Sequence, residues 1–422
     1  MSKKIRYLFS LLAGILAGLS LLWLLGANAA PKTNTVVVSN VAAGASTTTQ
    51  GQTAAVATST PAATPTPEPT PLPPATPPAS IGGEYLALGD SVAYGVGAPV
   101  PNQQGYAGIF YANYLKRIQP EILVYRNMAI PGETSQSFID GSKGQSQLQN
   151  ALNELDAAAG AGRKISPITL TIGGNDMLGA RGKPNSERET ALSRFDQNLN
   201  RILSALRSKA GQADIIVTTY YNPYAFSTGG DDTETAWVKR FDDVIRKRAG
   251  EHNAKVADFY TPIAGHERNL TWITFGDVHP TLTGHSLLAQ AVWKASGYDT
   301  TAPLLKLTYS PLAPDRVVAG SNRLPFKFSA QENWAETLLN GAADSDVAGA
   351  GVLLSADAVV DNGNKVSLAA VPTRLSNVPA DAREYSYILD TGLLASGPHT
   401  LRFEVSDTAG NVGTLDVKFE VD

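Results

Sequence analysis

Between residues 81 and 298, short apolar strands alternate with helical segments, and this alternation constrains the fold more than any other feature of the chain. The strands are expected at residues 84–88, 122–125, 168–172, 215–219 and 255–257. In the segments between most of them, apolar residues recur at the spacing of amphipathic helices. Apolar strands separated by helices favour a parallel sheet that is covered on both faces. We therefore expect an α/β domain over residues 81–298.

Polar and glycine-rich segments lie where the expected strands end. They are residues 89–91 (GDS), 131–134 (PGET) and 173–176 (GGND), and a fourth such segment, 277–279 (DVH), precedes the last helix. Active sites of open parallel sheets lie at the carboxyl ends of the strands. We expect these four loops to converge on one edge of the sheet.

Ser91 is the candidate nucleophile, because it directly follows a strand in a glycine-flanked turn. A serine needs a base, and the base needs an orienting group. His279 is the candidate base, and Asp277 is placed to hold its imidazole. No G-x-S-x-G motif occurs, which argues against a standard α/β-hydrolase elbow. The alternative for Ser91 alone is a helix cap or a turn residue.

Acyl transfer also needs donors for the oxyanion that develops in the transition state. The candidates are the backbone N–H groups of Ser91 and Gly132 and the side-chain amide of Asn175. Turn-forming roles are the alternatives for Gly132 and Asn175.

The other polar candidates are weaker. His285 is a rival base, but no acid precedes it by two residues. Asp90 is expected to be a structural hydrogen-bonding residue. No H-E-x-x-H motif accompanies His266, so no metal or cofactor is expected. Residues 140–164 are interpreted as a long loop that could form a lid.

Four ordered blocks carry a resemblance to a known family: residues 88–92 (LGDSV), 127–134 (NMAIPGET), 173–176 (GGND) and 277–280 (DVHP). In order and spacing they resemble the SGNH/GDSL hydrolases, and the resemblance covers about residues 81–298. It implies a flavodoxin-like three-layer α/β/α fold and metal-free ester hydrolysis through an acyl-enzyme. By block it implies Ser91 as nucleophile, Gly132 and Asn175 as oxyanion donors, and His279 as base with Asp277 orienting it.

The first 80 residues differ in composition from the rest. Residues 1–30 combine a basic start, an apolar run and an Ala-Asn-Ala site, which is typical of a secretory signal peptide or an N-terminal membrane anchor. Residues 31–80 are rich in Thr, Ala and Pro, with nine prolines between Pro61 and Pro78. Such a segment cannot bury enough surface to fold, and it indicates a disordered, extended spacer. We expect a secreted or cell-surface protein.

Residues 299–422 lack helical periodicity. Apolar residues alternate at 305–309, 401–405 and 417–421, and turn signals separate them, which predicts a β-sandwich. The segments 385–390 and 397–412 resemble bacterial Ig-like repeats of exported proteins. Such a module would contact a cell surface, a polysaccharide or another protein, or only space the enzyme.

Composition excludes several classes. The net charge of −4 and the lack of a basic block argue against nucleic-acid partners, and the absence of cysteine excludes disulfides and a thiol nucleophile. The sequence thus predicts an exported serine hydrolase that cleaves carboxylic esters, with an acylated glycan, a small lipid or a lysophospholipid as substrate. The alternatives are a non-catalytic surface adhesin on a dead hydrolase scaffold and an acyltransferase that uses the same triad.

Overall fold

The structure of the protein is a computed structural model, and it describes residues 80–422 apart from 120, 123, 142–145, 226–231, 314–315, 321, 332–352 and 372–381. The expected signal peptide or anchor at residues 1–30, and all but the last residue of the expected spacer at 31–80, lie outside the described residues. Among the described helices, none combines the length and the apolar character that a membrane crossing requires.

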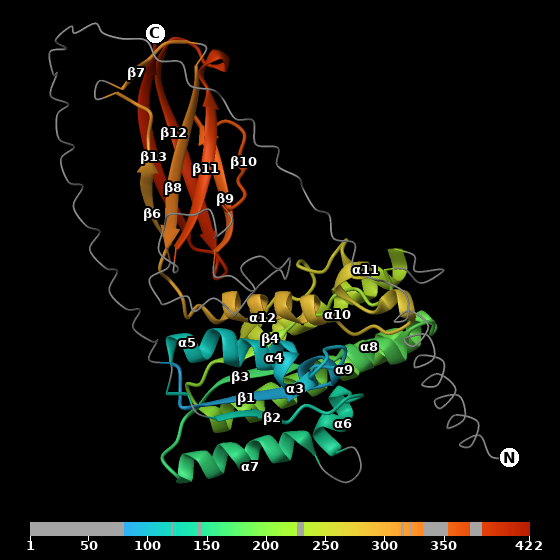
Figure 1. Ribbon diagram of the computed structural model, residues 1–422. Helices are drawn as coiled ribbons and strands as arrows, with labels where there is room; N and C mark the ends of the chain where they lie inside the picture. Colours follow the sequence, from blue (N-terminus) through green and yellow to red (C-terminus); the bar gives the residue numbers. More distant parts are fainter. Residues whose placement is uncertain are drawn as a thin grey trace, which may run out of the picture. The chain divides into compact units, whose positions relative to one another are not determined.

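A five-stranded parallel sheet forms the centre of the first folded part, in the order β2-β1-β3-β4-β5 (Figure 1). Its strands are β1 (Glu84–Gly89), β2 (Val124–Asn127), β3 (Ile165–Thr171), β4 (Ile215–Thr218) and β5 (Lys255–Ala257). The chain runs outward from β1 to β2 and then in the other direction through β3. The carboxyl ends of β1 and β3 therefore flank the crevice in which such sheets place their ligands.

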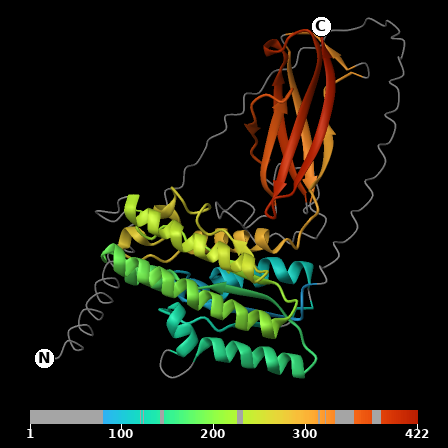
Figure 2. The ribbon, with the colours of Figure 1, turned by 180° about the vertical axis from the view of Figure 1, so that it is seen from behind.

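Helices cover both faces of this sheet, which confirms the predicted parallel α/β architecture. They are α2 (Ser91–Tyr94), α3 (Pro101–Gln104), α4 (Tyr106–Ile109), η1 (Phe110–Leu115), α5 (Lys116–Ile118), α6 (Ser135–Asp140), α7 (Gln147–Gly160), α8 (Gly174–Ala180), α9 (Asn185–Ala210), α10 (Asp232–Glu251), α11 (Glu267–Leu270), η2 (Ile273–Phe275) and α12 (Leu282–Ser296). On one face α4 packs with α12, and on the other α7 packs with α9, beside which α10 lies (Figures 1 and 2).

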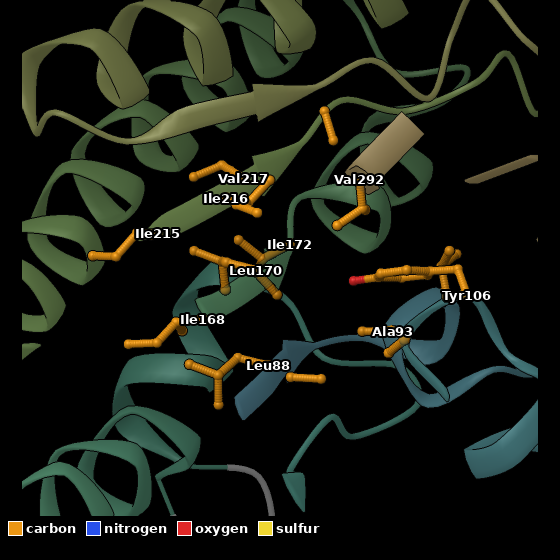
Figure 3. Packing of buried hydrophobic residues seen from close by; sticks show 14 of the residues in the cluster. Leu88, Ala93, Tyr106, Ile168, Leu170, Ile172, Ile215, Ile216, Val217 and Val292 are labelled. Carbon is orange, nitrogen blue, oxygen red and sulfur yellow. The ribbon is translucent and has the colours of Figure 1, made fainter. Parts of the chain in front are cut away.

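The central strands are buried along their whole length, as their apolar sequences predict. Leu88 of β1, Leu170 of β3 and Val217 of β4 form part of one continuous core, and Val292 of α12 packs into it (Figure 3). Each large apolar side chain in such a core contributes about 1.5–3 kcal/mol. The carboxyl ends of the strands are therefore held on a rigid base.

Strand β2 lies two residues later than predicted, because it starts at Val124 and not at Ile122. Ile122 is fully buried but precedes the strand. Since β2 is at the edge of the sheet, its last residues, Arg126 and Asn127, can be polar. The apolar residues from Ile122 onward therefore begin before the strand does.

The interpretation of residues 140–164 as a long lid-like loop is wrong for most of its length. Helix α7 occupies residues 147–160, and the side chain of Ser146 caps it by accepting a hydrogen bond from the Gln149 N–H. Leu148, Ala151, Leu155 and Ala158 recur at helical spacing and are buried. Because two of these four residues are alanine, the apolar periodicity was weak in the sequence.

The second folded part consists of β-strands. They are β6 (Leu304–Tyr309), β7 (Val317–Val318), β8 (Arg323–Gln331), β9 (Leu353–Val360), β10 (Val366–Ser367), β11 (Ala382–Asp390), β12 (Gly397–Asp407) and β13 (Val412–Val421), with a short helix η5 (Thr391–Leu393). One sheet has the order β10-β9-β12-β13-β7 and the other the order β11-β8-β6. Only the β7–β13 pair is parallel among the described strands of this part.

One apolar core joins these two sheets. The rings of Phe328 in β8 and Phe403 in β12 stack across it with their centroids 4.4 Å apart. Alternating residues of β12 and β13 point into this core, as the sequence predicted. The part is thus a packed pair of largely antiparallel sheets, and its assignment as an Ig-like module stays a prediction.

Candidate active site

Ser91 is positioned by the sharp end of strand β1. Gly89 has a φ of +132°, and a Cβ at this position would lie 1.9 Å from the carbonyl oxygen of Thr171 in the neighbouring strand β3. Only glycine permits this approach. Asp90 then caps helix α2 by accepting the Val92 N–H at 2.9 Å, and Ser91 is the first residue of that helix. The cap expected as an alternative role for Ser91 is thus made by its neighbour.

His279 and Asp277 lie on the segment that links η2 to α12. A β-bridge between Thr271 and Pro280 closes this segment, and the Trp272 N–H donates to the His279 carbonyl at 2.9 Å. The indole N–H of Trp272 also donates to the carbonyl of Gly97, at 2.9 Å, in the loop that follows α2. The segment that holds the histidine is thereby tied to the loop beside the serine.

The three candidate residues meet, although Ser91 and His279 are 188 positions apart in the sequence. The Nε2 atom of His279 lies 2.8 Å from the Ser91 Oγ, and its Nδ1 atom lies 2.5 Å from Oδ1 of Asp277. The same carboxylate oxygen accepts the backbone N–H of His279 at 3.0 Å. With Nδ1–H held by the carboxylate, Nε2 is the nitrogen free to accept the serine proton.

The candidate oxyanion donors line the same cavity as Ser91 and His279. This cavity has a volume of about 240 Å³, and Gly132 and Asn175 lie in its wall. The Asn175 Nδ2 donates to the Glu133 carbonyl at 2.9 Å, which fixes the orientation of the amide. Among the described residues, the N–H groups of Ser91 and Gly132 have no acceptor in the protein.

Apolar groups form most of the remaining wall. The lining side chains are Val92, Val96, Pro131, Met177, Leu178, Tyr220, Tyr221, Pro223 and Val278. Tyr221 also donates its hydroxyl to the carbonyl of Val278 at 2.7 Å, so it supports the segment between the acid and the base. The two tyrosines that follow strand β4, Tyr220 and Tyr221, thus line the cavity and do not merely end the strand.

Asp90 is buried beside the nucleophile, and other protein groups bond both of its carboxylate oxygens. Its Oδ1 accepts the Val92 N–H, and its Oδ2 accepts the hydroxyl of Tyr220. Burial raises the pKa of Asp90 to about 7, and the hydrogen bonds of Tyr220 and Val92 act in the opposite direction. Both oxygens are thus engaged in support of the loop, as the sequence interpretation of Asp90 expected.

His285, the rival base, is buried away from the serine. Its Nδ1 accepts the Tyr106 N–H at 3.2 Å, and its Nε2 donates to the Val96 carbonyl at 3.0 Å. Burial lowers the pKa of this histidine to about 4. The ring is therefore neutral, and both nitrogens are used to hold the loop after α2 against α4.

Several further polar residues shape the site through hydrogen bonds. Asp176 accepts both the N–H and the hydroxyl of Ser135, at 2.8 and 2.6 Å, and so joins the GGND loop to the start of α6. Gln147 and Glu133 are buried, and their side chains share a hydrogen bond. The block pattern pointed to Asp176 and Glu133, but nothing in the local sequence marked Gln147.

Within the described residues no group of three or more His, Asp or Glu side chains is arranged to hold a metal ion. The Asp90 carboxyl and the hydroxyls of Tyr220 and Tyr221 bond to other protein groups. The other polar groups of the cavity are the Ser91 hydroxyl, the His279 imidazole, the Asn175 amide and the N–H groups already described. Their arrangement provides a nucleophile, a base and candidate donors for a developing negative charge.

Comparison with protein families gives one match, which covers residues 87–287 and is described as the GDSL-like Lipase/Acylhydrolase family. Among curated proteins, an uncharacterized protein YpmR of Bacillus subtilis is 24% identical over 221 residues, 50% of this chain and 79% of that protein. The spore germination lipase LipC of Bacillus licheniformis is 24% identical over 51% of this chain and 96% of its own. Lipase 1 of Streptomyces coelicolor is 26% identical over 50% and 84%.

Solved structures similar to this chain include the lipase Lip_vut3 from a goat rumen metagenome, with 22% identity and a TM-score of 0.40 over 51% of this chain and 98% of that chain. The acetylxylan esterase Axe2 of Geobacillus stearothermophilus, as a catalytic mutant, has 19% identity and a TM-score of 0.38 over 51% and 94%.

Proposed function

We propose that the chain is an exported serine esterase that works through an acyl-enzyme. The match of residues 87–287 to the GDSL-like Lipase/Acylhydrolase family supports a carboxylic ester hydrolase. One observation carries the proposal. The Ser91 Oγ lies 2.8 Å from His279 Nε2 at the wall of a cavity, and Asp277 holds the other ring nitrogen.

In the proposed mechanism the Ser91 Oγ attacks the ester carbonyl carbon while His279 Nε2 takes the hydroxyl proton. The carbonyl oxygen becomes an oxyanion and accepts hydrogen bonds from Ser91 N–H, Gly132 N–H and the Asn175 amide. When the tetrahedral intermediate collapses, His279 gives its proton to the departing alcohol. Water then enters, His279 takes its proton, and the same steps release the acid.

Asp277 acts through the histidine in this scheme. Its carboxylate fixes the tautomer with the proton on Nδ1 and stabilises the imidazolium that forms in each half-reaction. Asp277 and His279 are two residues apart, and one carboxylate oxygen bonds both the ring and the backbone of the histidine. This arrangement supports His279, and not His285, as the base.

For the substrate we propose an ester with a short acyl chain or a soluble alcohol part, such as an acylated glycan, a small lipid or a lysophospholipid. The apolar wall formed by Val96, Leu178 and Val278 suits an acyl group better than a polar one. Helix α7 fills the segment that was interpreted as a lid, so that segment gives no support to a covering lid for long chains. Lipases among the relatives support ester cleavage in general.

The hydrogen-bonded Ser91, His279 and Asp277 support an active hydrolase over a dead scaffold that serves adhesion. A catalytically inactive protein would have no reason to keep all three side chains hydrogen-bonded to one another. No observation on the described residues favours an acyltransferase over a hydrolase, so transfer to a sugar is an outcome to test.

We also propose that the chain is secreted or tethered at the cell surface through residues 1–30, and that residues 31–80 act as a spacer. The sheets of the second folded part would then be an Ig-like module that contacts a cell surface or a polysaccharide. The alternating strands and the composition of the first 80 residues support these proposals.

The test is an assay of the full-length protein on p-nitrophenyl esters from acetyl to palmitoyl, with Ser91→Ala beside it. We expect the variant to lose nearly all turnover and to keep only the roughly 10³–10⁴-fold catalysis over water that binding and oxyanion donors supply. The chain-length profile then separates acetyl-glycan from lipid substrates. Wild-type turnover equal to that of Ser91→Ala on every ester would contradict the proposal.

A further inference from the structure

The carboxamide of Gln147 joins three elements of the proposed site. Gln147 is the first residue of α7 and is 1% exposed. Its Oε1 accepts the Gly89 N–H at 2.7 Å, and its Nε2 donates to the Gly89 carbonyl at 2.9 Å. A planar amide thus pairs with the peptide groups of the last residue of β1, two positions before Ser91. The pairing fixes the place at which the strand gives way to the serine.

The same amide nitrogen reaches the loop that carries Gly132. Gln147 Nε2 lies 3.2 Å from Oε2 of Glu133, and the other carboxylate oxygen of Glu133 accepts the Ser137 hydroxyl. Glu133 is 1% exposed, and among the described residues no lysine or arginine forms an ion pair with it. A buried carboxylate that relies on neutral donors is costly to keep. We therefore expect the Glu133 carboxylate, next to Gly132 in the chain, to have a function that offsets this cost.

Glu133 also contacts the third loop through its backbone. Its carbonyl accepts the Asn175 Nδ2, which turns that amide toward the cavity shared with Ser91. One connected set of hydrogen bonds thus runs from Gly89 through Gln147 and Glu133 to Asn175. Its ends are the nucleophile strand and the side-chain oxyanion donor.

We propose that Gln147 and Glu133 are positioning residues that set the distance of the Gly132 N–H and the Asn175 amide from Ser91. The inference rests on the proposed function, because it deepens the account of the same site. Donors help only when they are aimed at the place where the oxyanion forms, and a displacement of about 1 Å can cost on the order of 10²-fold in rate. Neither side chain touches the substrate in this scheme.

The main test replaces the amide by an apolar side chain of similar size, Gln147→Leu. We expect kcat on p-nitrophenyl acetate to fall by about 30- to 100-fold while KM changes less than about threefold, because the lost alignment matters in the transition state. Leu155→Ala is the matched control. Leu155 is buried on the same helix, about two turns after Gln147, so this variant should lower Tm and leave kcat unchanged.

A double-mutant cycle separates positioning from general support of the fold. If Gln147 acts through the oxyanion donors, Gln147→Leu should cost less than about threefold in an Asn175→Ala background. A merely structural role would give the same loss in both backgrounds. Affinity for a boronic acid that forms a tetrahedral adduct on the serine should fall with kcat in Gln147→Leu.

Glu133→Gln keeps the inference testable if Gln147→Leu does not fold. An amide at position 133 cannot accept from both Gln147 and Ser137, so we expect kcat to fall by about tenfold with KM unchanged. Wild-type kcat in every folded variant, or equal losses in both arms of the cycle, would overturn the inference while activity lost in Ser91→Ala kept the proposed function. Wild-type turnover no higher than that of Ser91→Ala would overturn both.

Discussion

The two folded parts of the chain bury polar side chains for different purposes. In the α/β part, Asp90, Glu133 and Gln147 are buried under loops that line the cavity. In the described β-sheet part, the buried Asp407 holds a turn, because its side chain accepts the N–H groups of Gly410 and Asn411 at 2.7 and 2.9 Å. Buried polar side chains that connect several loops mark a site where the positions of those loops matter for catalysis. Buried polar side chains that close a single turn do not mark such a site.

The largest expected effect tests whether the β-sheet part contributes only stability. Phe403→Ala removes a ring that stacks on Phe328 and should cost about 3–5 kcal/mol in the free energy of unfolding of that part. We expect kcat on p-nitrophenyl acetate to stay unchanged, as measured beside urea unfolding. Leu393→Ala is the control, since Leu393 is exposed in the same part. A fall in kcat would show that the two parts are coupled.

The next effect sharpens the comparison within the α/β part. Asn175→Ala should lower kcat by roughly 10²–10³-fold, because one donor to the oxyanion is lost. Asn185→Ala, at the exposed start of α9, should have no effect on kcat. Steady-state kinetics on a short-chain ester give the answer. A silent Asn175→Ala would mean that the oxyanion assignment is wrong.

A smaller effect concerns the pH dependence of the free energy of unfolding. Burial raises the pKa of Asp90 to about 7, so the folded state keeps the Asp90 proton to a higher pH than the unfolded chain does. The stabilisation is complete below about pH 4 and is lost as the pH rises toward 7. Asp90→Asn caps a helix equally well but does not titrate.

Between pH 4.5 and 7.5 the wild type should therefore lose on the order of 2 kcal/mol of unfolding free energy relative to Asp90→Asn, as measured by urea unfolding. Asp242, whose pKa burial also raises to about 7, is present in both proteins and cancels from the difference. A difference that does not depend on pH would contradict the prediction.

The smallest expected effect lies in the β-sheet part. It comes from hydrogen bonds that favour a charged histidine, whereas the Asp90 effect comes from burial that disfavours a charged carboxylate. His399 contacts Asp361 through Nδ1 at 2.5 Å and the Ala395 carbonyl through Nε2 at 2.7 Å, and these contacts raise the pKa of His399. Its stabilisation is complete below pH 6.5 and is lost as the pH rises through the raised pKa. His399→Gln should remove about 0.5 kcal/mol of this dependence, as measured by urea unfolding at pH 5.5 and 8.5. An unchanged pH profile would contradict it.

The sequence predicted the features that depend on local pattern. The apolar strands β1, β3 and β4 were placed within a few residues, because burial on both faces makes their sequences mostly apolar. The sequence also indicated that the loop of Ser91 and the segment of Asp277 and His279 converge, and in the structure these three residues are linked by hydrogen bonds. Which roles these residues carry stays a prediction until the variants are measured.

The sequence could not reveal features that depend on contacts between distant residues. Gln147 pairs with Gly89 across 58 positions, and nothing near either residue distinguishes this glutamine from an exposed one. Helix α7 was missed because alanines supply half of its weak apolar stripe. His285 and His279 look alike in the sequence, and only the buried contacts of His285 with Tyr106 and Val96 separate their roles.

The bridge between Thr271 and Pro280 has a consequence for engineering. Asp277 and His279 both lie inside the segment that this bridge closes, and Trp272 ties the segment to Gly97. The acid and the base therefore lie in one short bridged segment, and hydrogen bonds inside that segment set their relative geometry. In a redesigned enzyme, residues 271–280 are therefore best transferred as one unit, so that the proton-transfer pair is carried over intact.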